Sequence, residues 1–371
     1  MKRVFWPDWS RIQRSHRLGP WFPILAFFSF FYGSGVRSRL WAYKRGLFKR
    51  ERLPGFVLSI GNLTVGGTGK TPAVMTLAKW ARDEGRRVAV LSRGFGGRYT
   101  GGLLEVSDGK HVKADPRAAG DEPCLLAGKL SGVPVIVSQK RLPAGSFARE
   151  KFGCDFFILD DGFQHLELER DLDVVLMDAS NPFGNGHLLP WGPLREPVAQ
   201  LARADAFILT RAGDDGPGSK AGELLKARFP QTPVSLARHV PDKVVFPVSN
   251  KTRSPGFLKG KRVVAFCGIA QPEMFKKTLS ELGVDIAYFK AFHDHYKFKR
   301  EDIKNLMELK KKYHARIILT TEKDWVRMAV LGCEQPDIAY LSIEFVLTSN
   351  KDQIFKMIKD GFSAFENRKV V

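Results

Sequence analysis

The sequence predicts an α/β fold with a mostly parallel, doubly wound sheet and a second, smaller α/β domain. Short apolar strands alternate with helical stretches from residue 53 to about residue 210, which is typical of a parallel sheet covered by helices. A polar Gly/Pro segment at 211–220 precedes a second alternation of strands and helices. We therefore expect an N-terminal segment at 1–52, a first domain at 53–225 and a second domain at 226–371.

Length and composition fit two globular domains. The chain has 371 residues, of which 44% are hydrophobic and 26% charged. Its four cysteines, at 124, 154, 267 and 333, form no CxxC pair and no Cys/His cluster, which argues against a disulfide scaffold or a structural zinc site and for a reducing cytosol. No apolar run reaches the roughly 18 residues of a spanning helix, which excludes a multi-span transporter. The net charge of +20 predicts an acidic partner.

Half of the excess positive charge lies in residues 1–52. This segment holds twelve Lys and Arg against two acids, and it contains the most apolar stretch of the chain, residues 21–32. As a helix this stretch would span roughly 18 Å, against a hydrocarbon core of about 30 Å. Apolar length with basic flanks favours a membrane-interface helix, and a helix packed on the domain is the alternative. The basic residues that follow the apolar core argue against a signal peptide.

The two domains are expected to contain nine strands and at least three helices. Val74, Leu77, Ala78 and Ala81 recur at helical spacing and mark a helix that ends at Gly85. Apolar runs predict strands at 55–60, 87–91, 133–138, 156–159, 173–177, 206–210, 263–267, 284–289 and 316–320. Further helices are expected at 272–282 and 300–313. Residues 234–250 are expected to be extended and to connect the domains.

A glycine-rich loop separates the first strand from the first helix. Residues Thr64–Thr71 read TVGGTGKT, a variant of the P-loop, whose strict pattern has Gly where Thr64 stands. In this setting backbone N–H groups approach phosphate oxygens and the helix N-terminus adds a positive dipole end. Lys70 is expected to reach the β- and γ-phosphates, and the Thr71 hydroxyl to bind Mg²⁺. This context favours a P-loop NTPase-type nucleotide site over a structural glycine turn.

Further polar residues are expected around this loop. Asp160 and Asp161 follow the strand at 156–159, at the end of the strand where ligands bind in open α/β sheets. One of them is explained as the cap of the next turn, but the pair is more than a structural role requires. Acids and histidines also occur at 120–123 (GDEP), 162–165 (GFQH) and 292–296 (FHDHY). Each string alone fits a helix cap, a tight turn or surface histidines, but together they offer carboxylates and imidazoles to one cleft.

Seven segments occur in a fixed order along the chain. They are 59–72 (SIGNLTVGGTGKTP), 91–95 (LSRGF), 120–123 (GDEP), 159–165 (LDDGFQH), 194–197 (LREP), 292–296 (FHDHY) and 319–324 (LTTEKD). In this order they resemble the tetraacyldisaccharide 4'-kinase family, the lipid A 4'-kinases of Gram-negative bacteria. The resemblance implies transfer of the γ-phosphate of ATP to the 4'-hydroxyl of a tetraacylated, 1-phosphorylated glucosamine disaccharide, at the cytoplasmic face of the inner membrane.

The resemblance also implies the catalytic groups. Asp121 is expected to take the proton of the acceptor hydroxyl, with His295 as its partner from the second domain. A base and a partner on opposite sides of the cleft imply that the domains close over the substrate. His293 lies close by in the sequence and competes with His295 for this role.

The remaining roles concern nucleotide, metal and phosphate. ATP is expected to bind at Leu63, Thr64, Val65, Gly66, Gly67, Thr68, Gly69, Lys70 and Thr71. Mg²⁺ is expected at Thr71, with Glu122, Asp160 or Asp161 holding it directly or through water. Arg93 and Arg195 are candidates for the substrate or the γ-phosphate, because a guanidinium binds phosphate in a bidentate manner. His165 is expected to contact nucleotide or to support the paired aspartates.

Two other functions stay open from the residues alone. The chain fits a P-loop kinase or ATPase acting on another membrane-bound phosphorylated acceptor, or a membrane-associated nucleotide switch, although no NKxD-like string occurs in the expected place. Nucleic-acid binding is disfavoured because the aromatic residues cluster in one run instead of alternating with basic ones. The expected partners are an acylated glucosamine disaccharide phospholipid and an anionic inner-membrane surface, with no nucleic acid and no protein partner implied.

Overall fold

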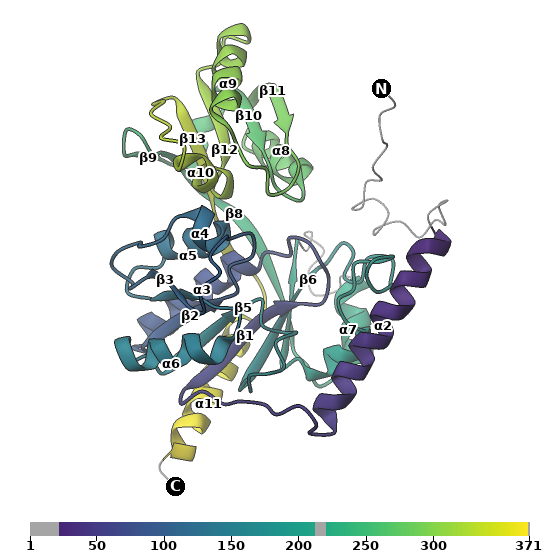
Figure 1. The fold of residues 1–371 in the computed structure, drawn as a ribbon. Coiled ribbons are helices and arrows are strands. Elements are labelled where there is room, and N and C mark those ends of the chain that lie inside the picture. Colours follow the sequence, from purple (N-terminus) through teal and green to yellow (C-terminus); the bar gives the residue numbers. More distant parts are fainter. Residues whose placement is uncertain (1–21, 212–219, 370–371) are drawn as a thin grey trace.

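The computed structural model describes residues 22–211 and 220–369. Residues 1–21 of the expected N-terminal segment, and most of the expected loop at 211–220, lie outside the described residues. Within the described part, thirteen strands form one sheet in the order β11-β10-β12-β13-β8-β7-β6-β1-β5-β2-β4-β3, with β9 paired to β8. Neighbouring strands are parallel except in the pairs β3–β4, β8–β9 and β8–β13. The expected mostly parallel α/β sheet is confirmed (Figure 1).

The strands carry the buried apolar runs of the sequence. They are β1 (Phe56–Asn62), β2 (Val88–Ser92), β3 (Leu104–Ser107), β4 (Val135–Val137), β5 (Phe156–Asp160), β6 (Leu172–Asp178), β7 (Ala206–Thr210), β8 (Val234–Phe246), β9 (Lys251–Arg253), β10 (Arg262–Cys267), β11 (Asp285–Ala291), β12 (Ile317–Thr321) and β13 (Ile338–Leu347). All seven residues of β1 are buried, as expected for a central parallel strand with helices on both faces.

The helices lie on both faces of this sheet and beside it. They are α2 (Phe22–Lys44), α3 (Lys70–Asp83), α4 (Pro116–Ala119), α5 (Asp121–Lys129), α6 (Arg141–Phe152), α7 (Lys220–Arg228), α8 (Pro272–Glu281), α9 (Arg300–Lys312), α10 (Glu322–Ala329) and α11 (Lys351–Lys369). The described residues also contain two 3₁₀ helices, η1 (Val198–Arg203) and η3 (Pro255–Leu258).

The sheet is shared by two units. Figure 1 shows β1–β7 with α3, α5, α6 and α7 in a first unit, and β10–β12 with α8–α10 in a second unit above it. The long strand β8 pairs with β7 through Val234–Ala237 and then with β13 as far as Val245. The chain therefore crosses between the units through two antiparallel strands, β8 and β13.

The C-terminal helix α11 packs on the first unit. Ile354, Ile358, Phe362 and Phe365 are buried in the same core as Phe56 of β1, and the rings of Phe56 and Phe362 are 5.7 Å apart. The sequence division places residues 351–369 in the second domain, although their contacts lie with the first. The boundary at residue 225 between the two expected domains stays a proposal. It concerns the segments between β8 and β13.

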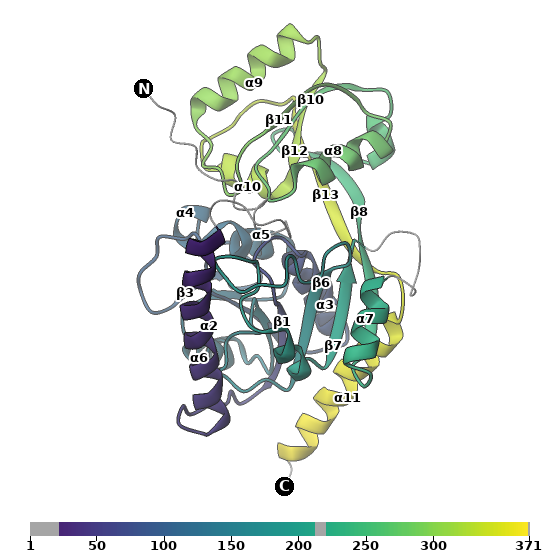
Figure 2. The same cartoon turned by 90° about the vertical axis from the view of Figure 1, so that its right-hand side faces the viewer.

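Helix α2 runs along the outside of the first unit (Figure 2). Its inner side is anchored by the Ser29 hydroxyl, which donates to the Leu188 carbonyl at 2.9 Å, and by the Tyr32 hydroxyl, which donates to the Arg195 carbonyl at 2.9 Å. Its outer side leaves four phenylalanines, at 27, 28, 30 and 31, between 56% and 68% exposed. Of the helices in the described ranges, none combines the length and the apolarity that crossing a membrane requires.

Candidate active site

The glycine-rich loop joins β1 to α3 and is held by neighbouring groups. The Asn62 amide donates to the Thr64 carbonyl at 2.6 Å, and Thr210 Oγ1 donates to the Thr68 carbonyl at 3.1 Å. Gly69, the N-cap of α3, has φ 87, and a Cβ there would lie 2.7 Å from the His239 ring. Glycine is therefore required both by the backbone angle and by the close histidine. These contacts fix the loop at the N-terminus of α3, a position that favours binding of an anion.

Lys70 points to the second of the paired aspartates. Lys70 Nζ lies 3.4 Å from Asp161 Oδ1, and Arg195 Nη1 lies 2.7 Å from Asp161 Oδ2. Burial works against ionisation of Asp161, but Lys70 and Arg195 outweigh it and hold the pKa of this carboxyl below its usual value. Asp161 also has φ 57, an uncommon angle outside glycine that is often found at functional sites. The structure thus brings three of the residues predicted from sequence together.

Asp160 lies deeper, at the end of β5. The Ser92 hydroxyl donates to Asp160 Oδ2 at 3.0 Å, while Asp160 Oδ1 is buried without a hydrogen-bond partner among the described residues. Burial, together with the neighbouring carboxylates of Glu122 and Asp161, raises the pKa of Asp160 to about 7. Carboxyl groups that oppose one another's ionisation in this way would be stabilised by a cation. Within the ranges 22–211 and 220–369, no group of three or more Asp, Glu, His or Cys side chains is arranged to hold a metal ion by itself.

Asp121 and Glu122 begin α5 directly after Gly120. Gly120 has φ 92 and ψ 159, a combination that is essentially restricted to glycine. A Cβ at this position would lie 2.5 Å from the Phe95 carbonyl oxygen. This glycine therefore allows the turn between α4 and α5 to place two adjacent carboxylates at the edge of the cleft.

Replacing Gly120 with Ala is expected to destabilise the protein by about 2–3 kcal/mol or more, because backbone strain and the clash with the Phe95 carbonyl add together. Gly128→Ala is the matched control in the same helix. A Cβ at Gly128 meets no atom within 4 Å, so this change should be neutral or slightly stabilising. Thermal unfolding of both variants tests the expectation, and equal melting temperatures would contradict it.

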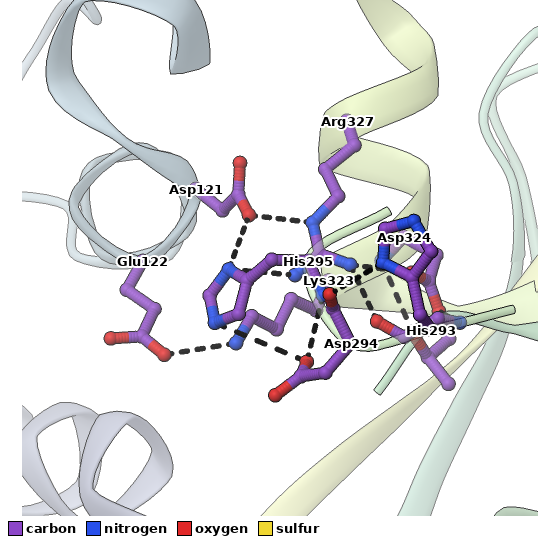
Figure 3. A network of polar contacts seen from close by, with 10 residues as sticks. Asp121, Glu122, His293, Asp294, His295, Lys323, Asp324 and Arg327 are labelled. Atoms are coloured by element: carbon purple, nitrogen blue, oxygen red, sulfur yellow. Dashed lines mark hydrogen bonds and ion pairs between the residues drawn. The ribbon is translucent and has the colours of Figure 1, made fainter. Parts of the chain in front are cut away.

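The second unit reaches over these carboxylates (Figure 3). His295 Nδ1 lies 3.3 Å from Asp121 Oδ2, and His295 has φ 56 in the loop between β11 and α9. From α10, Arg327 Nε lies 2.5 Å from Asp121 Oδ2 and Lys323 Nζ lies 2.9 Å from Glu122 Oε1. Burial opposes ionisation of Asp121, but the contacts with His295 and Arg327 outweigh it and lower the pKa of this carboxyl. Asp121 is therefore an ionised carboxylate at neutral pH.

The two histidines of the FHDHY segment differ in position. His293 Nδ1 contacts the Asp294 carbonyl oxygen at 3.0 Å on the exposed side of the loop. His295 is the one that contacts Asp121. His165 follows the paired aspartates. Burial, followed by several surrounding arginines, of which Arg141 has the largest effect, lowers the pKa of His165 to about 4. A neutral imidazole at this position fits a supporting role better than binding to phosphate.

A cavity of about 340 Å³ lies between α2 and the first unit. Six residues predicted from sequence line it: Val65, Arg93, Glu122, Asp160, Asp161 and Arg195. Helix α2 contributes Tyr32, Val36, Arg39 and Leu40 to the opposite wall. Asp121 and His295 are not themselves lining residues. Their neighbours are: Glu122 follows Asp121 in the chain, and the Phe95 ring is 6.0 Å from the His295 ring. The cavity thus joins the glycine-rich loop, the paired aspartates and α2.

Several residues of this site were not predicted. Arg327 carries no signal in the sequence, because a lone arginine on an amphipathic helix is usually a solvated residue. Lys323 lies within the LTTEKD segment, which marked the region without giving the lysine a role. Ser92 and Gln164 lie beside predicted residues, where Gln164 Oε1 accepts from Arg195 Nη1 at 3.3 Å. Their proximity to the cleft depends on how the strands align, which the sequence leaves open.

Comparisons with known proteins agree over nearly the whole chain. A family model described as tetraacyldisaccharide-1-P 4'-kinase matches residues 21–361. A tetraacyldisaccharide 4'-kinase of Syntrophus aciditrophicus is 40% identical over 371 residues, covering 97% of this chain and 98% of the relative. One of Geobacter metallireducens is 43% identical over 305 residues, covering 82% and 88%. The crystal structure of the "apo" form of LpxK from Aquifex aeolicus in complex with ATP has a TM-score of 0.75 and 33% identity, covering 92% of this chain and 99% of that one.

Proposed function

The chain belongs to the tetraacyldisaccharide-1-P 4'-kinase family, and we propose that it transfers the γ-phosphate of ATP to the 4'-hydroxyl of tetraacyldisaccharide 1-phosphate. The family expected from the seven motif segments is thereby confirmed. One observation carries the proposal: Val65 of the glycine-rich loop and residues of α2 line the same cavity, and Glu122, which also lines it, follows directly on Asp121, a carboxylate whose pKa is lowered by His295 and Arg327. This arrangement supports reaction between a nucleotide on the loop and an acceptor beside α2.

The nucleotide phosphates would lie on backbone N–H groups within residues 63–71, other than that of Val65, which donates to the Pro193 carbonyl at 2.8 Å. Lys70 would lie beside the terminal phosphate. Lys70 is held for this role by Asp161, at 3.4 Å. The oxygen ligands of Thr71, Asp160, Asp161 and Glu122 suit Mg²⁺, which is usually held by one or two carboxylates together with substrate phosphates. The unpartnered Asp160 Oδ1 fits such an ion. When bound, Mg²⁺ supplies positive charge that neutralises the phosphates.

Asp121 would accept the proton of the acceptor hydroxyl. Phosphoryl transfer proceeds through a loose transition state, so that orientation of the nucleophile matters more than a strong base. A carboxylate with a lowered pKa is suited to this, because it is ionised and ready to accept a hydrogen bond. His295 Nδ1, at 3.3 Å, orients the carboxylate from the second unit.

The acceptor would occupy the cavity between the first unit and α2. Arg39, Arg93 and Arg195 line it and supply positive charge for phosphate groups. The exposed outer face of α2 would then lie in the membrane surface with its phenylalanines among the acyl chains. We place the protein on this basis at the anionic, cytoplasmic face of the inner membrane.

Incubation with γ-labelled ATP and purified tetraacyldisaccharide 1-phosphate tests the reaction. We expect label in the lipid, at the 4'-position. A second arm uses the same lipid already phosphorylated at the 4'-position, which should accept no label. Label released as inorganic phosphate without any in the lipid would contradict the proposal and point to an ATPase.

Replacing the phenylalanines at 27, 28, 30 and 31 with Ser is expected to reduce sedimentation with anionic phospholipid vesicles by roughly 10-fold or more, because four exposed aromatic rings are lost from the membrane face. The control replaces four exposed apolar residues elsewhere with Ser: Val112, Leu224, Met274 and Ile343, which are 41–52% exposed. The control should bind as the unmodified protein does. Equal binding of the two variants would place the membrane contact elsewhere.

A further inference from the structure

Helix α10 presents two cations to the two carboxylates that begin α5. Lys323 and Arg327 lie one helical turn apart and contact Glu122 and Asp121 respectively (Figure 3). We propose that Arg327 is a positioning residue for phosphoryl transfer, which fixes the Asp121 carboxylate toward the acceptor hydroxyl and does so only when the second unit is seated on the first. This inference rests on the proposed function and adds a residue to its machinery.

Arg327 is held rigidly on its own unit. Its Nη1 donates to Asp324 Oδ1 at 2.9 Å and to the Gly268 carbonyl at 2.7 Å. The side chains of Arg327 and Asp324 are only 5% and 0% exposed. The other oxygen of Asp324 accepts from Thr321 Oγ1 at 2.6 Å and from the Gly268 N–H at 3.0 Å. Because the guanidinium is planar, these bonds of Nη1 fix the orientation of the whole group. Its Nε–H then points to Asp121.

The contact between Arg327 and Asp121 does not depend on the protonation of His295. Nδ1 of His295 lies 3.3 Å from Asp121 Oδ2 and 3.3 Å from Arg327 Nη2. An arginine nitrogen only donates and an ionised carboxylate only accepts, so that Nδ1 serves one of them at a time. With a proton it donates to Asp121, and without one it accepts from Arg327. In both states the Arg327 Nε–H donates to Asp121, which makes Arg327 its constant partner.

The neighbouring pair is less suited to this role. The side chains of Lys323 and Glu122 are 22% and 35% exposed, so that solvent screens their attraction. Arg327 and Asp121 are 5% and 19% exposed. A buried guanidinium loses less freedom than a lysine when it holds a carboxylate at a fixed angle. The geometry therefore assigns positioning of Asp121 to Arg327, with Lys323 as a weaker clamp on Glu122.

A purely structural role for Arg327, as the counter-ion of Asp324, is the alternative, and kinetics distinguish the two. We expect Arg327→Ala to lower kcat by roughly 100-fold, as for a displaced catalytic group, with KM for ATP within a factor of about 2. Added guanidinium ion, which supplies the missing donor, should restore part of kcat in a saturable manner. Asp121→Asn should gain nothing from the same addition, since its defect is the carboxylate itself.

Two further variants guard against misfolding. Arg327→Lys keeps a cation beside Asp324 and should fold, but one ammonium cannot make all the contacts of the guanidinium, so that kcat should still fall roughly 10-fold. Arg262→Ala removes an exposed arginine of the same unit, paired with Asp285, and should keep the unmodified rate.

Three results overturn the inference while leaving the proposed function intact. They are a near-normal kcat for folded Arg327→Ala or for Arg327→Lys, a loss of kcat that guanidinium does not restore, and a loss that follows the melting temperature alone. If the unmodified protein places no label in the lipid, the proposed function itself fails. Transfer of label by the unmodified protein therefore distinguishes a failure of the proposed function from a failure of the inference on Arg327.

Discussion

Asp121→Asn is expected to lower kcat by roughly 1,000-fold, because a positioned general base contributes about 10²–10⁴ to the rate. The asparagine keeps the size of the side chain and an oxygen that Arg327 Nε–H can still reach, so the local structure should survive. What it loses is the capacity to take a proton. ATP affinity should change by less than a factor of about 2, because this carboxyl contacts His295 and Arg327 of the second unit and its loss should act on the chemical step.

Single-turnover transfer of label and equilibrium binding of ATP measure the two quantities separately. Asp115→Asn is the matched control, since Asp115 is also a carboxylate at a helix start, where it accepts from the Ala118 N–H at 2.9 Å. It should keep the normal rate and nearly normal stability, because Asn caps a helix about as well as Asp does. Turnover of Asp121→Asn within about 10-fold of the unmodified protein would remove Asp121 from the role of base.

The sequence predicts the first unit well because its signals are local. Buried parallel strands are short apolar runs, and the start of α3 is marked by Gly69 and Lys70. β1, β5, β6 and β7 lie within about two residues of their expected ranges. Asp160 and Asp161 were predicted for the same reason. A strand and the polar residues at its end lie in one short stretch of the sequence.

What the sequence did not predict depends on contacts between distant segments. β13 alternates in burial along Ile338–Leu347 but was not assigned, because its partner β8 is about 100 residues away in sequence. α11 follows it and returns to β1, which no local signal indicates. Arg327 reaches Asp121 across the two units for the same reason, and only the assembled sheet brings them together.

α2 illustrates a different limit. Its composition indicated an apolar helix with basic ends. The two alternatives were membrane contact and packing on the domain, and each is compatible with a different face of the helix. The inner side bonds to Leu188 and Arg195, while the outer phenylalanines are exposed. The composition of the segment does not tell which of its apolar residues face the protein and which face solvent. The position of the helix in the structure does. The same helix therefore lines the cavity and offers a surface to lipid.

Lys70→Ala is expected to weaken ATP binding by roughly 10-fold and to lower kcat by roughly 100- to 1,000-fold, because the ammonium stabilises phosphate charge in the ground state and more strongly in the transition state. This double loss distinguishes it from Asp121→Asn, which should affect kcat alone. Lys79→Ala is the control: Lys79 lies exposed on the same helix, α3, and should leave both quantities unchanged. Asp161 keeps Arg195 at 2.7 Å in the variant, so the pair should remain ionised and the fold intact. Normal ATP affinity together with a normal rate would show that the glycine-rich loop holds no phosphate, and the proposed reaction would then lack its donor site.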